Sequence, residues 1–214
     1  EAKDRETFER LRNHILDSRL FEGLDLYGFD VSPVFQFFLK TECFPFCRLL
    51  WDGRGLKVTD SSWALQYNFP LMRVLKITLE PEGFDPAQTK RPFVLRFQPL
   101  EDEGLVFEHP NKKDIERAIE RFDPDVILAP YGDGYTLRRL RALGVGTLSR
   151  SGAHVRLGRE RTIASYGRVY AKKGPVLLEG RLHLDPKNSF FYPEVGLEGL
   201  IELSRLCAIP LQEL

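Results

Sequence analysis

The sequence lacks the long apolar runs that mark membrane proteins. No run in its 214 residues approaches the roughly 18–20 apolar residues that span a bilayer, so we expect no membrane partner. We expect no secretory leader, because the sequence does not open on such a pattern. The first residue is Glu1 rather than Met, which predicts a piece of a longer protein. Charged residues (29%) and hydrophobic residues (43%) suit one large globular domain or two small ones.

Cysteine is too scarce to build a disulfide framework. The chain contains only Cys43, Cys47 and Cys207. Cys43 and Cys47 are four residues apart, but no second pair of Cys or His lies nearby to complete a zinc site. We therefore expect small buried thiols in a reducing, cytoplasmic compartment.

Motifs for several common chemistries are also missing. None of the four histidines has a metal-type partner four residues further along. The sequence has no phosphate-binding Gly-x-x-x-x-Gly-Lys loop, no dinucleotide-binding Gly-x-Gly-x-x-Gly after a strand, and no nucleophile elbow. His183 and Asp185 alternate on an expected strand and could form a hydrogen-bonded pair. A structural role is the simpler interpretation of such a pair.

The net charge is zero, but the charges are unevenly distributed. The segment 138–181 contains eleven Lys or Arg and two acidic residues, so it carries +9 and the remainder carries −9. This asymmetry predicts a basic face for a polyanion on an otherwise acidic body. The alternative is that folding disperses these charges around the surface.

Hydrophobic periodicity predicts an α/β protein. The alternation of Leu75, Ile77 and Leu79 with polar residues is typical of a half-buried strand. We expect helices at 4–18, 33–40, 112–122, 136–143 and 194–206. We expect strands at 23–27, 49–51, 56–58, 73–80, 93–97, 105–107 and 126–129, and twisted hairpins over 150–181. The order from residue 73 onward predicts a mixed sheet with helices packed against it.

Several sequence fragments, taken in order, resemble the family-B DNA polymerases. The fragments lie at 27–31, 75–80, 122–128, 131–136, 165–170, 180–185 and 200–210. They include Phe122-Asp-Pro-Asp-Val-Ile-Leu128, similar to the strand before the second exonuclease motif, and Tyr131-Gly-Asp-Gly-Tyr-Thr136 in the place of that motif. The chain is most similar to accessory archaeal and bacterial members of the altered, inactivated type.

This resemblance implies a domain organisation and a set of partners. Residues 1–69 would be part of a small α+β N-terminal domain, and 70–214 a degenerate exonuclease-like domain with a ribonuclease-H-like fold. The polymerase palm, fingers and thumb would follow Leu214. The implied partners are DNA, as a single strand or a primer-template, and the remaining polymerase domains. The implied location is cytoplasmic and nucleoid-associated.

The resemblance also implies that the nuclease chemistry is lost. Two-metal phosphodiester hydrolysis holds two cations about 3.5–4 Å apart with carboxylates. The family's Asp-x-Glu pair matches Thr78 and Glu80, its second-motif Asp matches Thr136, and its Tyr-x-x-x-Asp matches Phe190 and Glu194. We therefore predict no catalytic residue, no metal site and no cofactor, with Mg²⁺ or Mn²⁺ entering only if residual nuclease activity exists.

Lys76 lies on the same expected strand face as Thr78 and Glu80. One hypothesis is that its ammonium pairs with Glu80 where a metal ion once lay. The alternative is that Lys76 extends into solvent, because lysine is seldom fully buried.

Basic and aromatic residues remain that could contact DNA. Lys and Arg neutralise phosphates and aromatic rings stack on bases, a combination that suits single strands. The candidate DNA-binding residues are Tyr131, Tyr135, Arg150, Arg161, Tyr166, Arg168, Tyr170 and Lys172. Tyr166 and Tyr170 could instead face the core, because aromatic residues are common in strands.

Three functions stay open at this point. The first is an exonuclease-like module that binds or positions DNA, or braces the polymerase, without cutting. The second is an active 3′–5′ exonuclease that uses Glu80, Asp133 and Glu194 with unusual partners. The third is a purely structural or protein-docking domain.

Overall fold

The computed structural model describes residues 5–18, 33–80, 94–100, 104–108, 110–152, 155–158, 160–165 and 167–214. The chain divides into two compact units. Unit 1 comprises Glu1–Ala64 with Arg205–Pro210, and unit 2 comprises Leu65–Ser204 with Leu211–Leu214. The strand expected at 23–27 lies outside the described residues.

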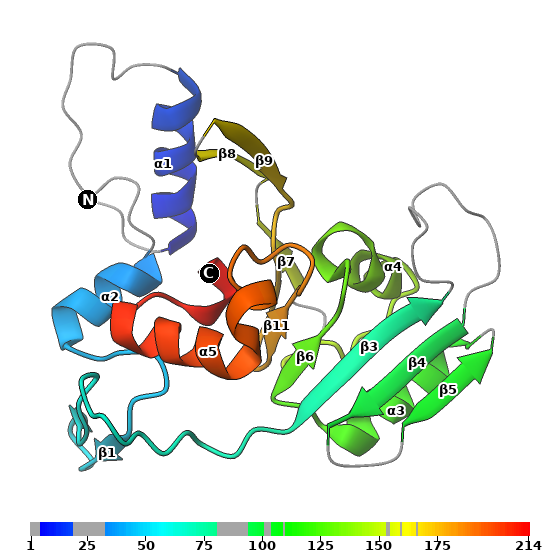
Figure 1. The fold of residues 1–214 in the computed structure, drawn as a ribbon, viewed down its shortest axis with the longest axis horizontal. Coiled ribbons are helices and arrows are strands. Elements are labelled where there is room, and N and C mark those ends of the chain that lie inside the picture. Colours follow the sequence, from blue (N-terminus) through cyan, green and yellow to red (C-terminus); the bar gives the residue numbers. More distant parts are fainter. Residues whose placement is uncertain are drawn as a thin grey trace. The chain divides into compact units, whose positions relative to one another are not determined.

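Unit 2 is built on a five-stranded mixed sheet (Figure 1). The strands lie in the order β11-β6-β3-β4-β5. They are β3 (Val74–Glu80), β4 (Val94–Pro99), β5 (Leu105–Glu108), β6 (Val126–Leu128) and β11 (Leu182–Leu184). β3, β4 and β5 are antiparallel neighbours, whereas β6 runs parallel to both β3 and β11. The predicted mixed sheet is therefore confirmed.

Helices cover one face of this sheet and close the core. Figure 1 shows α3 (Lys112–Phe122) behind β3, β4 and β5. Its buried Ile115 and Ile119 join Leu75, Ile77 and further strand residues in one hydrophobic cluster. The α3 helix begins at the N-cap Asn111, whose side chain accepts a hydrogen bond from the Asp114 amide at 3.1 Å.

The segment after β6 differs from the expected helix at 136–143. A π-helical turn, η2 (Gly132–Thr136), comes first, and the short helix α4 (Leu137–Ala142) continues it. Leu137 and Leu140 of α4 are fully buried in the same hydrophobic cluster as α3. α5 (Tyr192–Cys207) is the last long helix, with a break at Gly196, and the 3₁₀ turn η3 (Leu211–Glu213) follows it.

The basic segment forms strand pairs, as predicted. β7 (Val155–Leu157) pairs antiparallel with β10 (Val176–Leu178). β8 (Arg161–Ser165) pairs with β9 (Arg168–Lys172) in a hairpin. Residues 165–170 therefore do not form one strand, because β8 ends and β9 begins within them.

An arginine–aspartate network joins the amino ends of the three parallel strands. Arg73 precedes β3, Asp125 precedes β6 and Arg181 precedes β11. The Arg73 guanidinium lies 2.7 Å from Asp123 and 3.3 Å from Asp125, and Arg150 lies 3.1 and 2.7 Å from the same two carboxylates. Arg181 lies 2.8 Å from Asp123. Although burial acts to raise it, the pKa of Asp125 lies well below its usual range because Arg73 and Arg150 donate hydrogen bonds to its carboxylate. The Asp-Pro-Asp fragment thus has a structural role at this edge.

Unit 1 contains two helices and a small hairpin. These are α1 (Arg5–Ser18), α2 (Pro33–Thr41), β1 (Leu49–Trp51) and β2 (Leu56–Val58), all close to the predicted bounds. All three cysteines are free, but only Cys43 is buried, so the expectation of buried thiols is wrong for the exposed Cys207. Burial raises the pKa of Cys47. No helix among the described residues is long and apolar enough to cross a bilayer.

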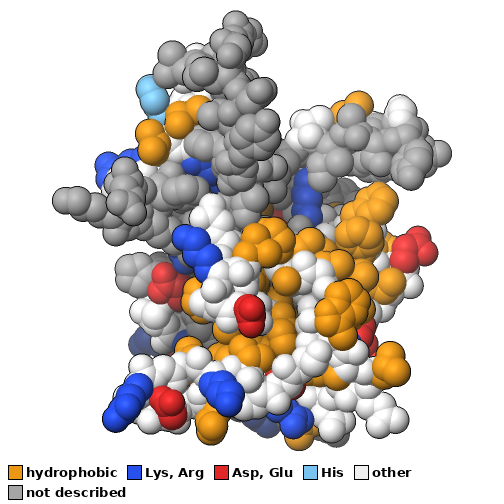
Figure 2. All heavy atoms as spheres, turned by 90° about the vertical axis from the view of Figure 1, so that its left-hand side faces the viewer, with side chains coloured by type: hydrophobic (Ala, Val, Ile, Leu, Met, Phe, Trp, Pro, Cys, Tyr) orange, Lys and Arg blue, Asp and Glu red, His pale blue; other side chains and the backbone are white. Residues whose placement is uncertain are grey.

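Unit 1 also exposes many large apolar side chains. One face of the molecule, shown in Figure 2, carries many hydrophobic side chains close together. The exposed large apolar residues of unit 1 are Leu11, Phe37, Leu39, Leu49, Leu50, Trp51, Leu56, Trp63 and Leu206. In the hairpin, Trp51 is paired with Leu56 across the strands, and both are more than half exposed. A two-stranded hairpin with an exposed apolar face is only marginally stable alone.

Arg205 holds together two distant segments of unit 1. Its side chain is 2% exposed and donates hydrogen bonds to the backbone carbonyls of Ser61, Ser62 and Ala64. One guanidinium fork satisfies all three carbonyls, which a single ammonium cannot do in the same geometry.

Replacing Arg205 by Met should lower the free energy of unfolding of unit 1 by about 2–4 kcal/mol, since three carbonyls in partly buried hydrogen bonds lose their charged donor. Arg205→Lys should recover only part of this loss. Both tryptophans, Trp51 and Trp63, lie in unit 1, so tryptophan fluorescence in a urea titration monitors this unit. The control is Arg54→Met at an exposed position, and equal losses for both Met variants would contradict the prediction.

Candidate functional site

The carboxyl ends of β3, β6 and β11 meet at one edge of the sheet because the three strands are parallel. Ligand sites in open α/β sheets commonly lie at this edge. The residues after β6 (Tyr131–Asp133) and after β11 (Asp185 onward) both lie here, joined by hydrogen bonds. Residues 131–133, in the fragment that resembles the second exonuclease motif, therefore lie beside Asp185, at the end of the fragment 180–185.

Asp185 fixes the start of the η2 turn. Its carboxylate accepts hydrogen bonds from the backbone amides of Tyr131 at 3.0 Å, Asp133 at 3.1 Å and Lys187 at 2.9 Å. The side chain thus caps the η2 amides from another part of the chain. Burial raises the pKa of Asp185, while the bonds from Lys187 and Asp133 act in the opposite direction.

Both carboxylate oxygens of Asp133 also accept hydrogen bonds. Its Oδ1 accepts a hydrogen bond from the Val176 amide of β10 at 2.7 Å, and its Oδ2 accepts one from Nδ2 of Asn188 at 2.7 Å. The backbone carbonyl of Asp133 accepts a bond from Nε of Arg138. Asp133 is only 5% exposed. Both carboxylate oxygens therefore serve to join η2 to β10 and to the loop after β11.

His183 packs against both of these elements. Its Nδ1 lies 3.1 Å from the Val176 carbonyl oxygen and 3.4 Å from Oδ1 of Asp133. A carbonyl can only accept, so Nδ1 carries the proton and donates it to Val176. Burial lowers the pKa of His183 despite the neighbouring Asp133, which keeps the ring neutral near pH 7. The expected pairing with Asp185 is thus replaced by contacts with Val176 and Asp133.

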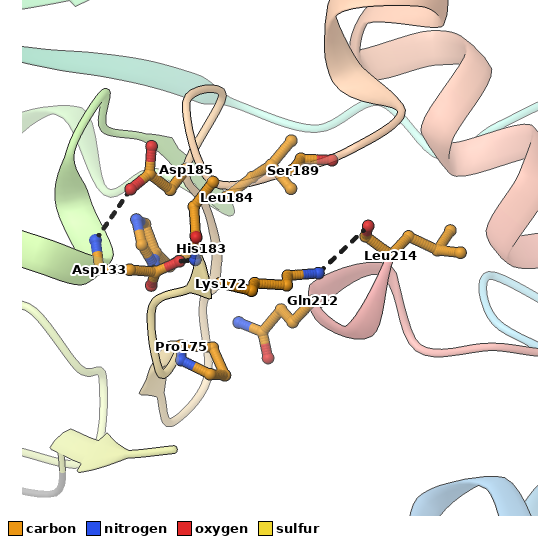
Figure 3. Close-up of a pocket in the computed structure, with 10 residues that line it drawn as sticks. Asp133, Lys172, Pro175, His183, Leu184, Asp185, Ser189, Gln212 and Leu214 are labelled. Atoms are coloured by element: carbon orange, nitrogen blue, oxygen red, sulfur yellow. Dashed lines mark hydrogen bonds and ion pairs between the residues drawn. The ribbon is translucent and has the colours of Figure 1, made fainter. Parts of the chain in front are cut away.

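A small polar cavity opens beside these residues (Figure 3). Its volume of about 20 Å³ has room for roughly one water molecule. Figure 3 shows the Lys172 side chain extending toward Leu214, and Nζ of Lys172 lies 3.4 Å from the Leu214 carbonyl oxygen. The cavity is lined by Asp133, Lys172, Pro175, His183, Leu184, Asp185, Asn188, Ser189, Gln212 and Leu214.

The positions that match the family's metal ligands do not form a carboxylate cluster. Thr78 is buried, and the Thr136 hydroxyl donates to the Pro130 carbonyl at 3.1 Å. Glu194 is exposed, and the Glu80 side chain lies outside the described part of the structure, so the Lys76–Glu80 pairing stays a hypothesis. Among the described residues, no group of three or more His, Cys, Asp or Glu is placed to hold a metal ion.

The structure brings together only some of the predicted DNA-binding residues. Tyr131, 44% exposed, and the half-buried Tyr135 lie at the carboxyl edge. Lys172 lies nearby in the cavity wall. Arg150 is elsewhere, in the arginine–aspartate network at the amino ends of the strands.

Three of the remaining predicted DNA-binding residues belong to the β8–β9 hairpin. The backbones of Arg161, Arg168 and Tyr170 lie in its strands, and their side chains are outside the described part of the structure. Tyr166 is not described at all. Their part in DNA binding stays a prediction.

Two features of this edge were not predicted from the sequence. Asn188 joins three segments, because its amide group bonds Asp133 and also both the N–H and C=O groups of Lys173. Phe191 forms an edge-to-face pair with Phe190, with ring centroids 5.2 Å apart. No local pattern identifies Asn188, whereas two adjacent aromatic residues just before an expected helix could have drawn attention to Phe191.

Comparisons with known proteins address the fold. No protein-family model matches the chain, and no curated protein matches its sequence. A similar solved structure is described as that of the family B DNA polymerase from the hyperthermophilic archaeon Pyrobaculum calidifontis. The match has a TM-score of 0.54 and 20% identity over 94% of this chain, and it spans 28% of that polymerase's length. This likeness and the strand order confirm the predicted ribonuclease-H-like fold class.

Proposed function

We propose that this chain is part of a family-B DNA polymerase whose exonuclease-like unit positions DNA without cutting it. The match to one such polymerase supports the relationship. The main observation in support of a unit that does not cut DNA is the hydrogen bonding of Asp133. Both of its carboxylate oxygens accept hydrogen bonds from N–H groups. An oxygen that points at donors within the fold is poorly placed to coordinate a catalytic cation.

The other carboxylate at this edge supports the same conclusion. Asp185 accepts three backbone N–H bonds, so releasing it for a metal ion would leave these amides, including the buried amide of Asp133, without this partner. With Thr78 and Thr136 in the family's ligand positions, two divalent ions would lack the oxygens they need. The partners we propose are DNA and the remaining polymerase domains.

The proposal predicts salt-dependent binding of single-stranded DNA without cleavage. Fluorescence anisotropy of a labelled oligonucleotide across a salt series should show affinity that falls with a logarithmic slope of about −2 or steeper, since each single-strand phosphate contact contributes roughly −0.7. Incubation of the bound oligonucleotide with Mn²⁺ should leave its length unchanged. Absence of binding at low salt would remove the DNA-positioning function, and shortening from the 3′ end would establish a nuclease.

The exposed apolar surface of unit 1 supports a second candidate, docking to other polymerase domains. The hairpin residues Leu49, Trp51 and Leu56 are each close to half exposed or more, which is typical of surfaces that other protein segments cover. Under this proposal the chain braces a larger polymerase, with or without contacting DNA.

A further inference from the structure

An exposed aromatic pair lies in the loop between β11 and α5. Phe190 is 61% exposed and Phe191 is 39% exposed. Their rings meet edge to face, with centroids 5.2 Å apart and an interplanar angle of 88°. Two adjacent phenylalanines exposed to this degree form an apolar patch, and such patches often mark interaction sites.

The loop that carries this pair is firmly attached to unit 2. The amides of Asn188 and Ser189 both donate to the Asp185 carbonyl at 3.0 Å. The Tyr192 amide donates to the Ser189 hydroxyl at 3.3 Å, just after the pair. The backbone on both sides of the two rings is therefore fixed, so a ligand would meet a preorganised surface.

A third exposed aromatic residue is bonded to the same aspartate. The Tyr131 amide donates to the Asp185 carboxylate, and the Tyr131 side chain is 44% exposed. Tyr131 adopts the left-handed conformation with φ of 57°, which is uncommon for a residue other than glycine. Asp185 thus joins the segment that carries Tyr131 to the loop that carries Phe190 and Phe191.

The chemistry around the pair favours a polyanion. Asn188, two residues before Phe190, bonds the backbone of Lys173, whose side chain is exposed. Lys187, in the same loop, is exposed. Cations beside exposed aromatic rings are the combination that binds single-stranded nucleic acids, through phosphates and stacked bases respectively.

We propose that Phe190 and Phe191, together with Tyr131, form a stacking platform for the unpaired bases of a single-stranded nucleic acid. This inference rests on the proposed DNA-positioning function and identifies the surface that performs it. Phenylalanine has no hydrogen-bonding group in its side chain, so these two rings would stack on any base with little sequence preference. The platform thus binds the strand by its bases, while basic residues bind its phosphates.

The test separates base stacking from phosphate binding. Anisotropy would compare an oligothymidylate with an abasic oligonucleotide of equal length, using wild type and the double variant Phe190→Ala/Phe191→Ala. We expect the double variant to bind oligothymidylate roughly tenfold more weakly or worse, in line with losses seen when a stacking aromatic is removed. Its affinity for the abasic strand and its salt slope should be unchanged, because no phosphate contact is lost.

Two controls keep the result interpretable. Phe37→Ala removes a similarly exposed phenylalanine from α2 and should not alter binding. The variant Phe190→Tyr/Phe191→Tyr keeps both rings and should retain wild-type affinity. Circular dichroism would check that each variant is folded, which we expect because both rings are at the surface.

The outcomes distinguish this proposal from the one it rests on. If wild type binds oligothymidylate and the double Ala variant binds it equally well, the platform is wrong while DNA positioning stands. Equal weakening on the abasic strand would also overturn the platform, because it would show a phosphate or folding effect. If wild type binds neither oligonucleotide, both proposals fail and a protein partner becomes the occupant to test.

Discussion

Replacing Gly132 by Ala should destabilise unit 2 by about 3 kcal/mol, at the upper end of the usual range for overpacked cores. A Cβ atom at this position would lie 2.4 Å from Nε2 of His183 and 2.9 Å from Cβ of Ala129. Neither neighbour has room to move, because both are buried. The His183 ring is also held by its bonds to β10, so relief of the clash would require the η2 turn to shift.

Gly134, two residues further along the same turn, provides a matched control. A Cβ atom there would meet only Cγ of Lys173, at 3.7 Å, which is ordinary contact. Gly134→Ala should therefore change stability by less than about 1 kcal/mol. Urea unfolding followed by far-ultraviolet circular dichroism measures both variants. If Gly132→Ala and Gly134→Ala changed the free energy of unfolding equally, the His183 side chain would have to be far more mobile than its contacts indicate.

The sheet and its main helix could be predicted because their signal is local. In β3, Leu75 and Ile77 are buried, as the alternation of apolar and polar residues requires. The helix at 112–122 has the predicted bounds, because the apolar stripe that predicted it lies within one short segment of the sequence. The match to a solved polymerase structure supports the fold that the family resemblance implied.

The interior of the candidate site could not be predicted in the same way. Asp185 and Asp133 bond groups 43 to 55 residues away, and no spacing in the sequence indicates such partners. The spacing of His183 and Asp185 favoured a pair on one strand face, but His183 instead meets Asp133 from another element. The π-helical η2 turn depends on these long-range bonds, so local propensity predicted only the helix that follows it.

The basic segment shows how folding redistributes charge. Its +9 net charge predicted a basic face, but several of its cations have acidic or carbonyl partners within unit 2. Arg150 and Arg181 belong to the arginine–aspartate network. Lys173 pairs with Glu160 at 3.0 Å, and Arg138 donates to the Gly174 carbonyl at 3.2 Å. A net charge counted from the sequence includes these cations in full. Their partners in the fold offset part of the electrostatic potential that the cations produce at the surface.

Acid should weaken unit 2 through His183. Burial lowers the pKa of this ring in the fold below its ordinary value near 6.5. Below about pH 6.5 the unfolded chain therefore binds a proton that the folded ring does not take up, and the free energy of unfolding falls as the pH falls. The contribution of one such group is up to about 1.4 kcal/mol per pH unit. Protonation would also place a donor at Nε2, against the backbone of Gly132.

The groups that face His183 determine how this effect is isolated. Asp133 lies 3.4 Å away and favours the protonated ring, but burial outweighs it. Asp185, whose pKa is raised, contributes with the opposite sign, because the folded state keeps its proton to higher pH than the unfolded chain. Comparison of wild type with His183→Asn cancels the other titrating groups to first order, since an Asn amide can donate to Val176 without titrating.

Urea unfolding between pH 7 and pH 5 should therefore show a steeper loss of stability in wild type than in His183→Asn. Circular dichroism follows the unfolding of the whole chain, and tryptophan fluorescence, which reports unit 1 because both tryptophans lie there, identifies the part of the transition that unit 1 contributes. The Asn variant should be less stable at pH 7, where the well-packed neutral ring is lost, and the two curves should converge as the pH falls. Parallel curves would mean that His183 titrates alike in the folded and unfolded states, and the buried contacts that link η2, β10 and β11 would then be weaker than their geometry indicates.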